Sequence, residues 1–134
     1  FMPVCSEHIE QAEHNEELAQ RLIDDEPVIY KDWAVIVSFY SAVHFIEAFR
    51  ASQGGHSDYH TDRNNYVIFE FPNKIAKAYK KLYHLSRFLR YLEFRGDNKP
   101  PKGTWISDED VKTCVTVNLL NIKNEIYSRL KSTA

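Results

Sequence analysis

The sequence predicts an all-α fold: an up-and-down antiparallel bundle of four long helices and one short helix, in a single domain spanning 2–134. Three observations indicate this class. Residues 33–49 place apolar side chains on nearly every side of a helix, four further segments repeat apolar residues at helical spacing, and no credible strand pairing is present. Because a helix that is apolar all round needs other helices around it, 33–49 is expected at the centre.

Capping and breaking residues bound the first two helices. Apolar positions within 6–23 share one face of a helix, Ser6 is a fair N-cap, and the acidic residues before Pro27 stop the helix. The second helix begins near Asp32, a good N-cap, and ends at Gly54-Gly55, where glycine permits a left-handed C-cap. We therefore expect the first loop to lie between Ile23 and Asp32.

Three further helices follow in the second half of the chain. A short one is expected from 57 or 61 to 70, before a proline. The next begins with Asn73 as its N-cap and runs to about residue 95. After a Pro/Gly/Lys-rich loop over 97–105, Ser107 caps a fifth helix that runs to about residue 130, with acidic side chains in its first turn that complement the helix dipole.

Composition and charge limit the classes of protein that are consistent with this sequence. The chain has 134 residues, with 43% hydrophobic and 27% charged side chains, which is ordinary for one folded domain. Its net charge of −2 argues against a general nucleic-acid coat protein but not against a local basic groove. Because Ser38, His44 and Glu47 interrupt the apolar helix, we expect a cytoplasmic protein without a membrane span. Cys5 and Cys114 are expected as free thiols, with a disulfide as the alternative.

Two histidines, His56 and His60, have the i,i+4 spacing that zinc sites use on helices. The pattern lacks the glutamate of HExxH and a third ligand at a known spacing, so surface histidines at a helix start are the favoured interpretation. No Gly-rich phosphate loop, nucleophile elbow or Cys/His pair accompanies them. The sequence therefore predicts no metal and no cofactor, and it disfavours serine, cysteine and P-loop chemistry.

A polar cluster is expected where the two glycines fold the third helix back beside the second. His44 lies inside the apolar helix, His60 and Arg63 lie near the start of the third, and Arg90 on the fourth is expected to point toward them. Imidazole and guanidinium groups together suit phosphate binding and acid–base chemistry without a metal. The alternative is a polar network that holds the short helix to the bundle, because buried polar groups are usually hydrogen-bonded for structural reasons.

The fourth helix has a basic face interleaved with aromatic side chains. Positive charge beside aromatic rings suits single-stranded nucleic acid or a nucleotide. A solvated amphipathic face explains most of the lysines equally well. The basic residues are Lys74, Lys77, Lys80, Lys81, Arg87, Arg90 and Arg95, and the interleaved tyrosines are Tyr79, Tyr83 and Tyr91.

Short motifs follow one another in a fixed order along the chain. They are Tyr30-Lys31-Asp32-Trp33, Phe39-Tyr40-Ser41-Ala42-Val43-His44, Glu47-Ala48, His56…His60-x-x-Arg63 and Tyr83-His84-Leu85-Ser86-Arg87…Arg90-Tyr91. In this succession, over 9–130, the sequence resembles small bacterial and archaeal HEPN-domain proteins. The resemblance implies a helical bundle of four or five helices that is commonly dimeric. It also implies one of three activities: a metal-independent RNase of toxin or defence type, a nucleotide-binding protein, or the partner subunit of a minimal nucleotidyltransferase.

The motif associated with catalysis in HEPN RNases, Arg-x(4–6)-His on a late helix, is placed differently here. No histidine follows Arg87, Arg90 or Arg95 at that spacing, and the formal match is Arg50-x5-His56 at the end of the second helix. Chance alone gives about one such match in a chain of this composition. The resemblance therefore supports the fold more strongly than it supports RNA cleavage.

Two functions are expected from these patterns. The first is binding of a nucleotide or RNA, with metal-independent cleavage left open if a histidine takes the 2′-OH proton. The second is a non-catalytic module that dimerises and docks a partner, such as a nucleotidyltransferase, through its surplus of aromatic residues. Because apolar residues exceed what one small bundle encloses, a homodimer is expected. The residues expected to act are His60 and His44 on the proton, Arg63 and Arg90 on the phosphate, and Tyr40 and His56 as further ligand contacts.

Overall fold

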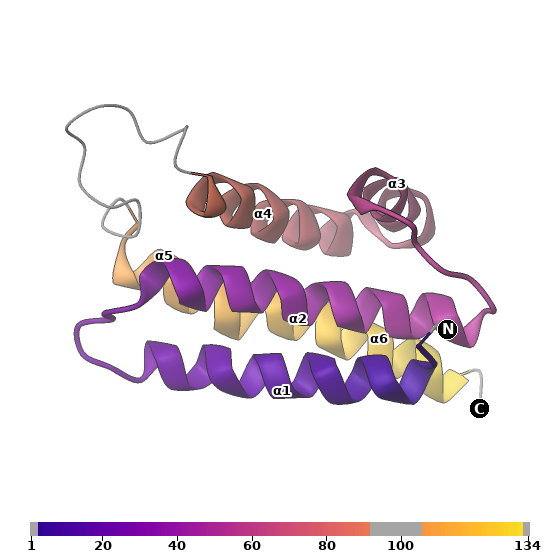
Figure 1. Ribbon diagram of the computed structural model, residues 1–134, viewed down its shortest axis with the longest axis horizontal. Helices are drawn as coiled ribbons and strands as arrows, with labels where there is room; N and C mark the ends of the chain where they lie inside the picture. The colour runs from indigo at the N-terminus through magenta and orange to yellow at the C-terminus, as the bar shows by residue number, and fades with distance from the viewer. Residues whose placement is uncertain (1–2, 92–105, 133–134) are drawn as a thin grey trace.

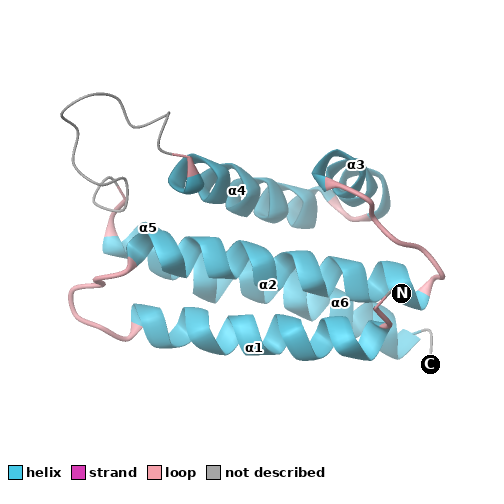
Figure 2. Cartoon of the chain, in the orientation of Figure 1, coloured by secondary structure: helices cyan, strands magenta, loops and turns pink. Residues whose placement is uncertain are grey.

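The computed structural model describes residues 3–91 and 106–132, and most of these residues are helical (Figure 1). Successive long helices run in opposite directions, and no strand occurs in the described ranges (Figure 2). The predicted all-α bundle is therefore confirmed. The helical elements are α1 (Cys5–Ile23), α2 (Lys31–Ser52), α3 (His60–Glu70), α4 (Asn73–Arg90), α5 (Asp108–Thr113), a π-helical stretch (Cys114–Leu119) and α6 (Leu120–Ser132).

Helix α2 lies at the centre of the bundle, with α1, α4 and α6 packed around it (Figure 1). The side chains of Phe39, Phe45 and Ile46 are fully buried. Toward α1, small residues meet at one point, where Ser41 Oγ donates a hydrogen bond to the Ala12 carbonyl at 2.7 Å. Small side chains at such a contact bring two helix axes close together. The predicted central position of the second helix is confirmed.

By length and composition alone, α2 meets the requirements of a membrane-spanning helix. Its Ser38, His44 and Glu47 do not exclude a span by themselves, contrary to the expectation from the sequence. In the structure, 72% of its most apolar window is buried inside the bundle, which is the environment of a core helix. Packing against the neighbouring helices therefore accounts for the apolar character of α2.

Two helices begin earlier than predicted. In α1 the N-cap is Val4, because the Glu7 carboxylate accepts a hydrogen bond from the Val4 amide at 2.9 Å and closes the first turn. Ser6, the predicted cap, lies inside this helix. Helix α2 begins at Lys31, so Asp32 lies in the first turn, where its negative charge still favours the positive end of the helix dipole.

Helix α4 has Pro72 at its N-cap, so the predicted cap Asn73 is its first residue. The helix ends at Arg90, earlier than predicted, and Tyr91 has extended backbone with φ −109° and ψ 113°. The predicted helix end at 95 and the loop over 97–105 lie outside the described residues. Arg90 is thus the last helical residue of α4, at the edge of the bundle.

The C-terminal helical segment starts as predicted, because Ser107 Oγ accepts a hydrogen bond from the Asp110 amide at 3.1 Å. Its α-helical turns are interrupted by the π-helical stretch, whose wider turn changes the angle between successive side chains. Leu119 is fully buried there, whereas Asn118, which was expected on the inner face, is only partly buried. Periodicity at 3.6 residues per turn therefore misplaces this part of the inner face.

The turn after α2 is built on the two glycines, as predicted. Gly54 has a φ of +79°, which is the left-handed conformation that glycine tolerates best. The Gly55 amide donates to the Arg50 carbonyl at 2.9 Å, and a Cβ at Gly55 would lie 3.0 Å from Arg50 Cγ. The turn returns the chain toward the bundle, and α3 begins at His60, close to the predicted start. It thereby brings the first residues of α3 beside α2.

Candidate functional site

A buried ion pair connects α2 with α3. Arg63 Nε donates a hydrogen bond to Glu47 Oε1 at 2.8 Å, and the two side chains are 12% and 5% exposed. Burial alone would raise the pKa of Glu47, but hydrogen bonds from Ser57 and Arg63 and the Arg63 charge outweigh burial and hold that pKa below its usual value. Glu47 is therefore anionic at neutral pH and neutralises the charge of Arg63.

His60 is oriented by this ion pair. Arg63 Nη1 lies 3.1 Å from His60 Nδ1. Because a guanidinium can only donate, Nδ1 is the acceptor, and the proton of the neutral ring is on Nε2. Burial, and then the charges of Arg63 and Arg90, lower the pKa of His60, so the ring is neutral at pH 7. His60 therefore presents an N–H donor on the side away from Arg63.

Arg90 reaches across from α4 to α2. Its Nη1 donates to Tyr40 Oη at 2.8 Å, and its Nε donates to the Ser86 carbonyl at 3.3 Å. The guanidinium carbon lies 5.7 Å from the centre of the Phe39 ring and 5.6 Å from that of Tyr40. In the described part of the chain, no carboxylate forms an ion pair with Arg90. Within the described residues, the contacts of Arg90 are therefore with neutral groups.

Aromatic rings connect His60 with Arg90. The centre of the His60 ring is 6.1 Å from that of Phe39 and 6.1 Å from that of Tyr83. Phe39 is buried, while Tyr83 is partly exposed. Because Tyr40 accepts a hydrogen bond from Arg90, its own O–H is left to donate elsewhere. Three donors, on Arg90, Tyr40 and His60, therefore surround one aromatic patch.

His44 belongs to a different contact. Its Nδ1 lies 3.0 Å from Nδ1 of His8, on α1, so one ring donates and the other accepts. Burial is the largest cause that lowers the pKa of both rings. His44 is not hydrogen-bonded to His60, Arg63 or Arg90 within the described residues. The structure therefore brings His60, Arg63 and Arg90 into one neighbourhood, while His44 is hydrogen-bonded to His8 and is close enough to the Glu47–Arg63 ion pair for both charges to act on its pKa.

His56 and Arg50, the formal match to the RNase motif, make different contacts within the described residues. His56 is exposed, and its Nε2 lies 3.8 Å from the Asp58 carboxylate. Arg50 donates to Ser57 Oγ at 2.8 Å and stacks 4.4 Å from the centre of the Tyr66 ring. Among the residues that the structure describes, no group of three histidine, cysteine or carboxylate side chains is arranged to hold a metal.

Sequence reasoning missed His8, Glu47 and Ser57 as members of these networks. His8 occupies the same inward stripe as Ala12 and Ala19, four and eleven residues later, and a histidine on an apolar stripe signals a buried partner. Glu47 is a carboxylate on an otherwise apolar helix, which requires a cation nearby. No sequence pattern comparable to these predicts the role of Ser57, because its burial depends on the turn that precedes α3.

Comparisons with protein-family models, with curated proteins and with solved structures find no match for this chain. The evidence on function lies in the arrangement of Arg90, Tyr40 and His60 and in the contacts around them.

Proposed function

We propose that this protein binds a nucleotide or single-stranded RNA, with a phosphate held by Arg90, Tyr40 and His60, which are called the Arg90 site from here on. One observation supports this above the others: Arg90 carries a positive charge that no carboxylate neutralises within the described residues. Arginine is well suited to phosphate because its planar group offers several N–H donors at once.

The neighbours of Arg90 fit the same ligand. The Tyr40 hydroxyl and the His60 Nε2–H add two donors, and neither of these groups brings a negative charge to the site. The partly exposed rings of Tyr40 and Tyr83 offer faces on which a base can stack. A site with donors, one net positive charge and aromatic faces favours a phosphate that carries a base over inorganic anions.

Binding without cleavage is the activity that the geometry supports best. A general base must offer a free nitrogen lone pair to the 2′-OH proton. In His60 that lone pair accepts from Arg63. In the His8–His44 pair, the ring that donates from Nδ1 keeps a free Nε2 lone pair, but no contact among the described residues joins this pair to Arg90, Tyr40 or His60. We therefore assign His60 as a hydrogen-bond donor to the ligand, in place of the proton-accepting role expected from the sequence.

Fluorescence anisotropy with a labelled single-stranded RNA tests this proposal, with Arg90→Gln compared against Arg87→Gln. Arg87 is exposed on the same helix, so both variants remove one positive charge from α4. We expect Arg90→Gln to weaken binding by about tenfold, or about 1.4 kcal/mol, and Arg87→Gln to change it less than about twofold. Absence of binding by the wild type at millimolar nucleotide, or equal losses in the two variants, would overturn the proposal. The RNA should be recovered intact.

A second candidate function is docking of a protein partner, either a second copy or the nucleotidyltransferase that the resemblance implies. Exposed apolar side chains at the start of α2 favour it: Ile29, Tyr30 and Trp33 are 67%, 53% and 55% exposed. Light scattering on the wild type and on Trp33→Ser tests self-association. A monomeric wild type at tens of micromolar would count against the homodimer.

A further inference from the structure

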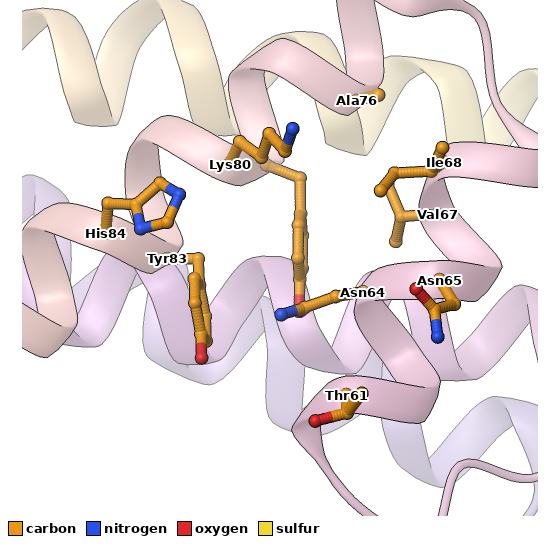
Figure 3. Close-up of a pocket in the computed structure, with 10 residues that line it drawn as sticks. Thr61, Asn64, Asn65, Val67, Ile68, Ala76, Lys80, Tyr83 and His84 are labelled. Atoms are coloured by element: carbon orange, nitrogen blue, oxygen red, sulfur yellow. The ribbon is translucent and has the colours of Figure 1, made fainter.

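A cavity of about 250 Å³ opens between α3 and α4, next to the Arg90 site (Figure 3). On the α3 side it is lined by Thr61, Asn64 and Asn65, and on the α4 side by Tyr83 and His84. Figure 3 shows the Asn64 side chain extending from α3 toward Tyr83. The cavity thus has hydrogen-bonding side chains along one helix and aromatic rings along the other.

The walls of this cavity have the chemistry of a pocket for a flat polar ring. Its inner wall includes Val67 and Ala76, which are 1% and 8% exposed. Asn64 Oδ1 is buried and has no hydrogen-bond partner within the described residues. Buried polar atoms are nearly always paired, so this amide oxygen beside the cavity can accept a hydrogen bond from a ligand. Rotation of this amide turns either its oxygen or its N–H₂ group toward a ligand.

The cavity and the Arg90 site share one wall. Tyr83 lines the cavity, and its ring centre is 6.1 Å from that of His60 in the Arg90 site. Thr61, another lining residue, directly follows His60 in the chain. Along α4, Arg90 lies seven residues after Tyr83, or roughly 10 Å at the rise of an α-helix. A ligand that extends along α4 by about that distance would contact both places.

We propose that the cavity between α3 and α4 takes the base of the nucleotide whose phosphate binds at the Arg90 site. This inference rests on the proposed function and adds the class of ligand: one unpaired nucleotide, read on an edge of its base. Tyr83 and His84 offer stacking surfaces, and Asn64 and Asn65 offer an acceptor and a donor to the base edge, as amide side chains do with nucleobases. A cavity of about 250 Å³ has room for one base.

Isothermal titration with nucleoside 5′-monophosphates, nucleosides and ribose 5-phosphate tests the two halves of the site separately. For the wild type we expect at least one monophosphate to bind about tenfold more tightly than ribose 5-phosphate. Asn64→Leu should remove that preference and leave ribose 5-phosphate binding unchanged, whereas Arg90→Gln should weaken both. Asn124→Leu, on the exposed side of α6, is the matched control and should bind as the wild type does.

His84→Ala is the second variant, because His84 is exposed and its loss leaves the core intact. It should weaken monophosphate binding several-fold without changing ribose 5-phosphate binding. If monophosphates and ribose 5-phosphate bind equally well to the wild type, the base pocket is wrong while the phosphate site stands. If nucleosides bind as tightly as monophosphates, the pocket stands and the phosphate site is wrong. If none of these ligands binds at millimolar concentration, both are wrong.

Discussion

Two arginines reach the central helix from neighbouring helices, Arg63 from α3 and Arg90 from α4, yet the groups that accept their hydrogen bonds differ in charge. Arg63 is paired with the buried Glu47 carboxylate. Arg90 is bonded to a tyrosine hydroxyl and a backbone carbonyl, which accept hydrogen bonds without cancelling its charge. We therefore expect Arg63 to stabilise the fold, and we propose that Arg90 keeps its charge for a ligand. On this hypothesis, the type of acceptor indicates the role of each arginine.

The largest effect is expected at the neutralised arginine. Glu47→Gln removes the carboxylate and leaves the Arg63 charge buried without an anion, so we expect a loss of about 3 kcal/mol in the free energy of unfolding. Urea unfolding at pH 7 measures it. The matched control is Glu17→Gln, which breaks the Glu17–Arg21 pair, whose side chains are 63% and 74% exposed. Because water and salt screen that pair, its loss should cost less than about 0.5 kcal/mol. Equal losses in the two variants would contradict a structural role for Arg63.

The opposite pattern is expected at Arg90. Arg90→Gln removes a charge that sits beside aromatic rings but pairs with no described carboxylate, so the free energy of unfolding should fall by less than about 1 kcal/mol. Urea unfolding, run beside the RNA-binding titration on the same samples, measures both properties. A loss of stability comparable with that of Glu47→Gln would make Arg90 a second structural arginine, and the contrast between the two residues would disappear.

The sequence predicts the fold better than the site, for physical reasons that particular residues illustrate. The central position of α2 follows from apolar side chains on every side, which only surrounding helices can bury. The contact between His60 and Arg63 follows from their i,i+3 spacing on one helix. The contact between His8 and His44, 36 residues apart, depends on the register between α1 and α2, which no local pattern encodes. The same holds for Arg90 and Tyr40, 50 residues apart.

Helix starts illustrate the same limit on a smaller scale. Ser6 has good N-cap chemistry, but Val4 takes that position because Glu7 bonds the Val4 amide. A helix start capped at Val4 competes with one capped at Ser6. The difference in free energy between these two starts is too small to be predicted from residue preferences. Ser107 has no such competitor and caps its helix as predicted.

The His8–His44 pair and the Glu47–Arg63 ion pair should lose their contributions to stability in different pH ranges. Burial, above all other causes, lowers the pKa values of His8 and His44, so the unfolded chain binds protons more readily than the folded one below the usual value of 6.5. Stability is therefore fully present above pH 6.5 and falls as the pH drops through the folded-state values. Glu47 acts in a lower window: its contribution is present above its usual value of 4.5 and is lost as the pH falls through its lowered pKa.

Urea unfolding at a series of pH values between about 7.5 and 5 tests the histidine part. His8→Gln removes one titrating ring, so the loss of stability over this range should be smaller than in the wild type. His14→Gln, an exposed position on the same helix, should follow the wild-type curve. A wild-type curve that is flat from pH 7.5 to 5 would show that the His8–His44 contact does not contribute to acid sensitivity.

The smallest effect is expected at the tyrosine that holds Arg90. Tyr40→Phe keeps the ring against the guanidinium but removes the hydroxyl that accepts from Nη1 at 2.8 Å. Stability should change by about 1 kcal/mol or less, the usual net worth of one partly exposed hydrogen bond. RNA affinity should fall several-fold, because Arg90 loses its orientation and the ligand loses the Tyr40 O–H donor. Tyr30→Phe, an exposed tyrosine just before α2, is the control and should leave affinity unchanged. Unchanged RNA affinity in Tyr40→Phe would mean that Arg90 does not need the Tyr40 hydroxyl to orient it. The contrast between the acceptors of Arg63 and Arg90 would then not indicate their roles.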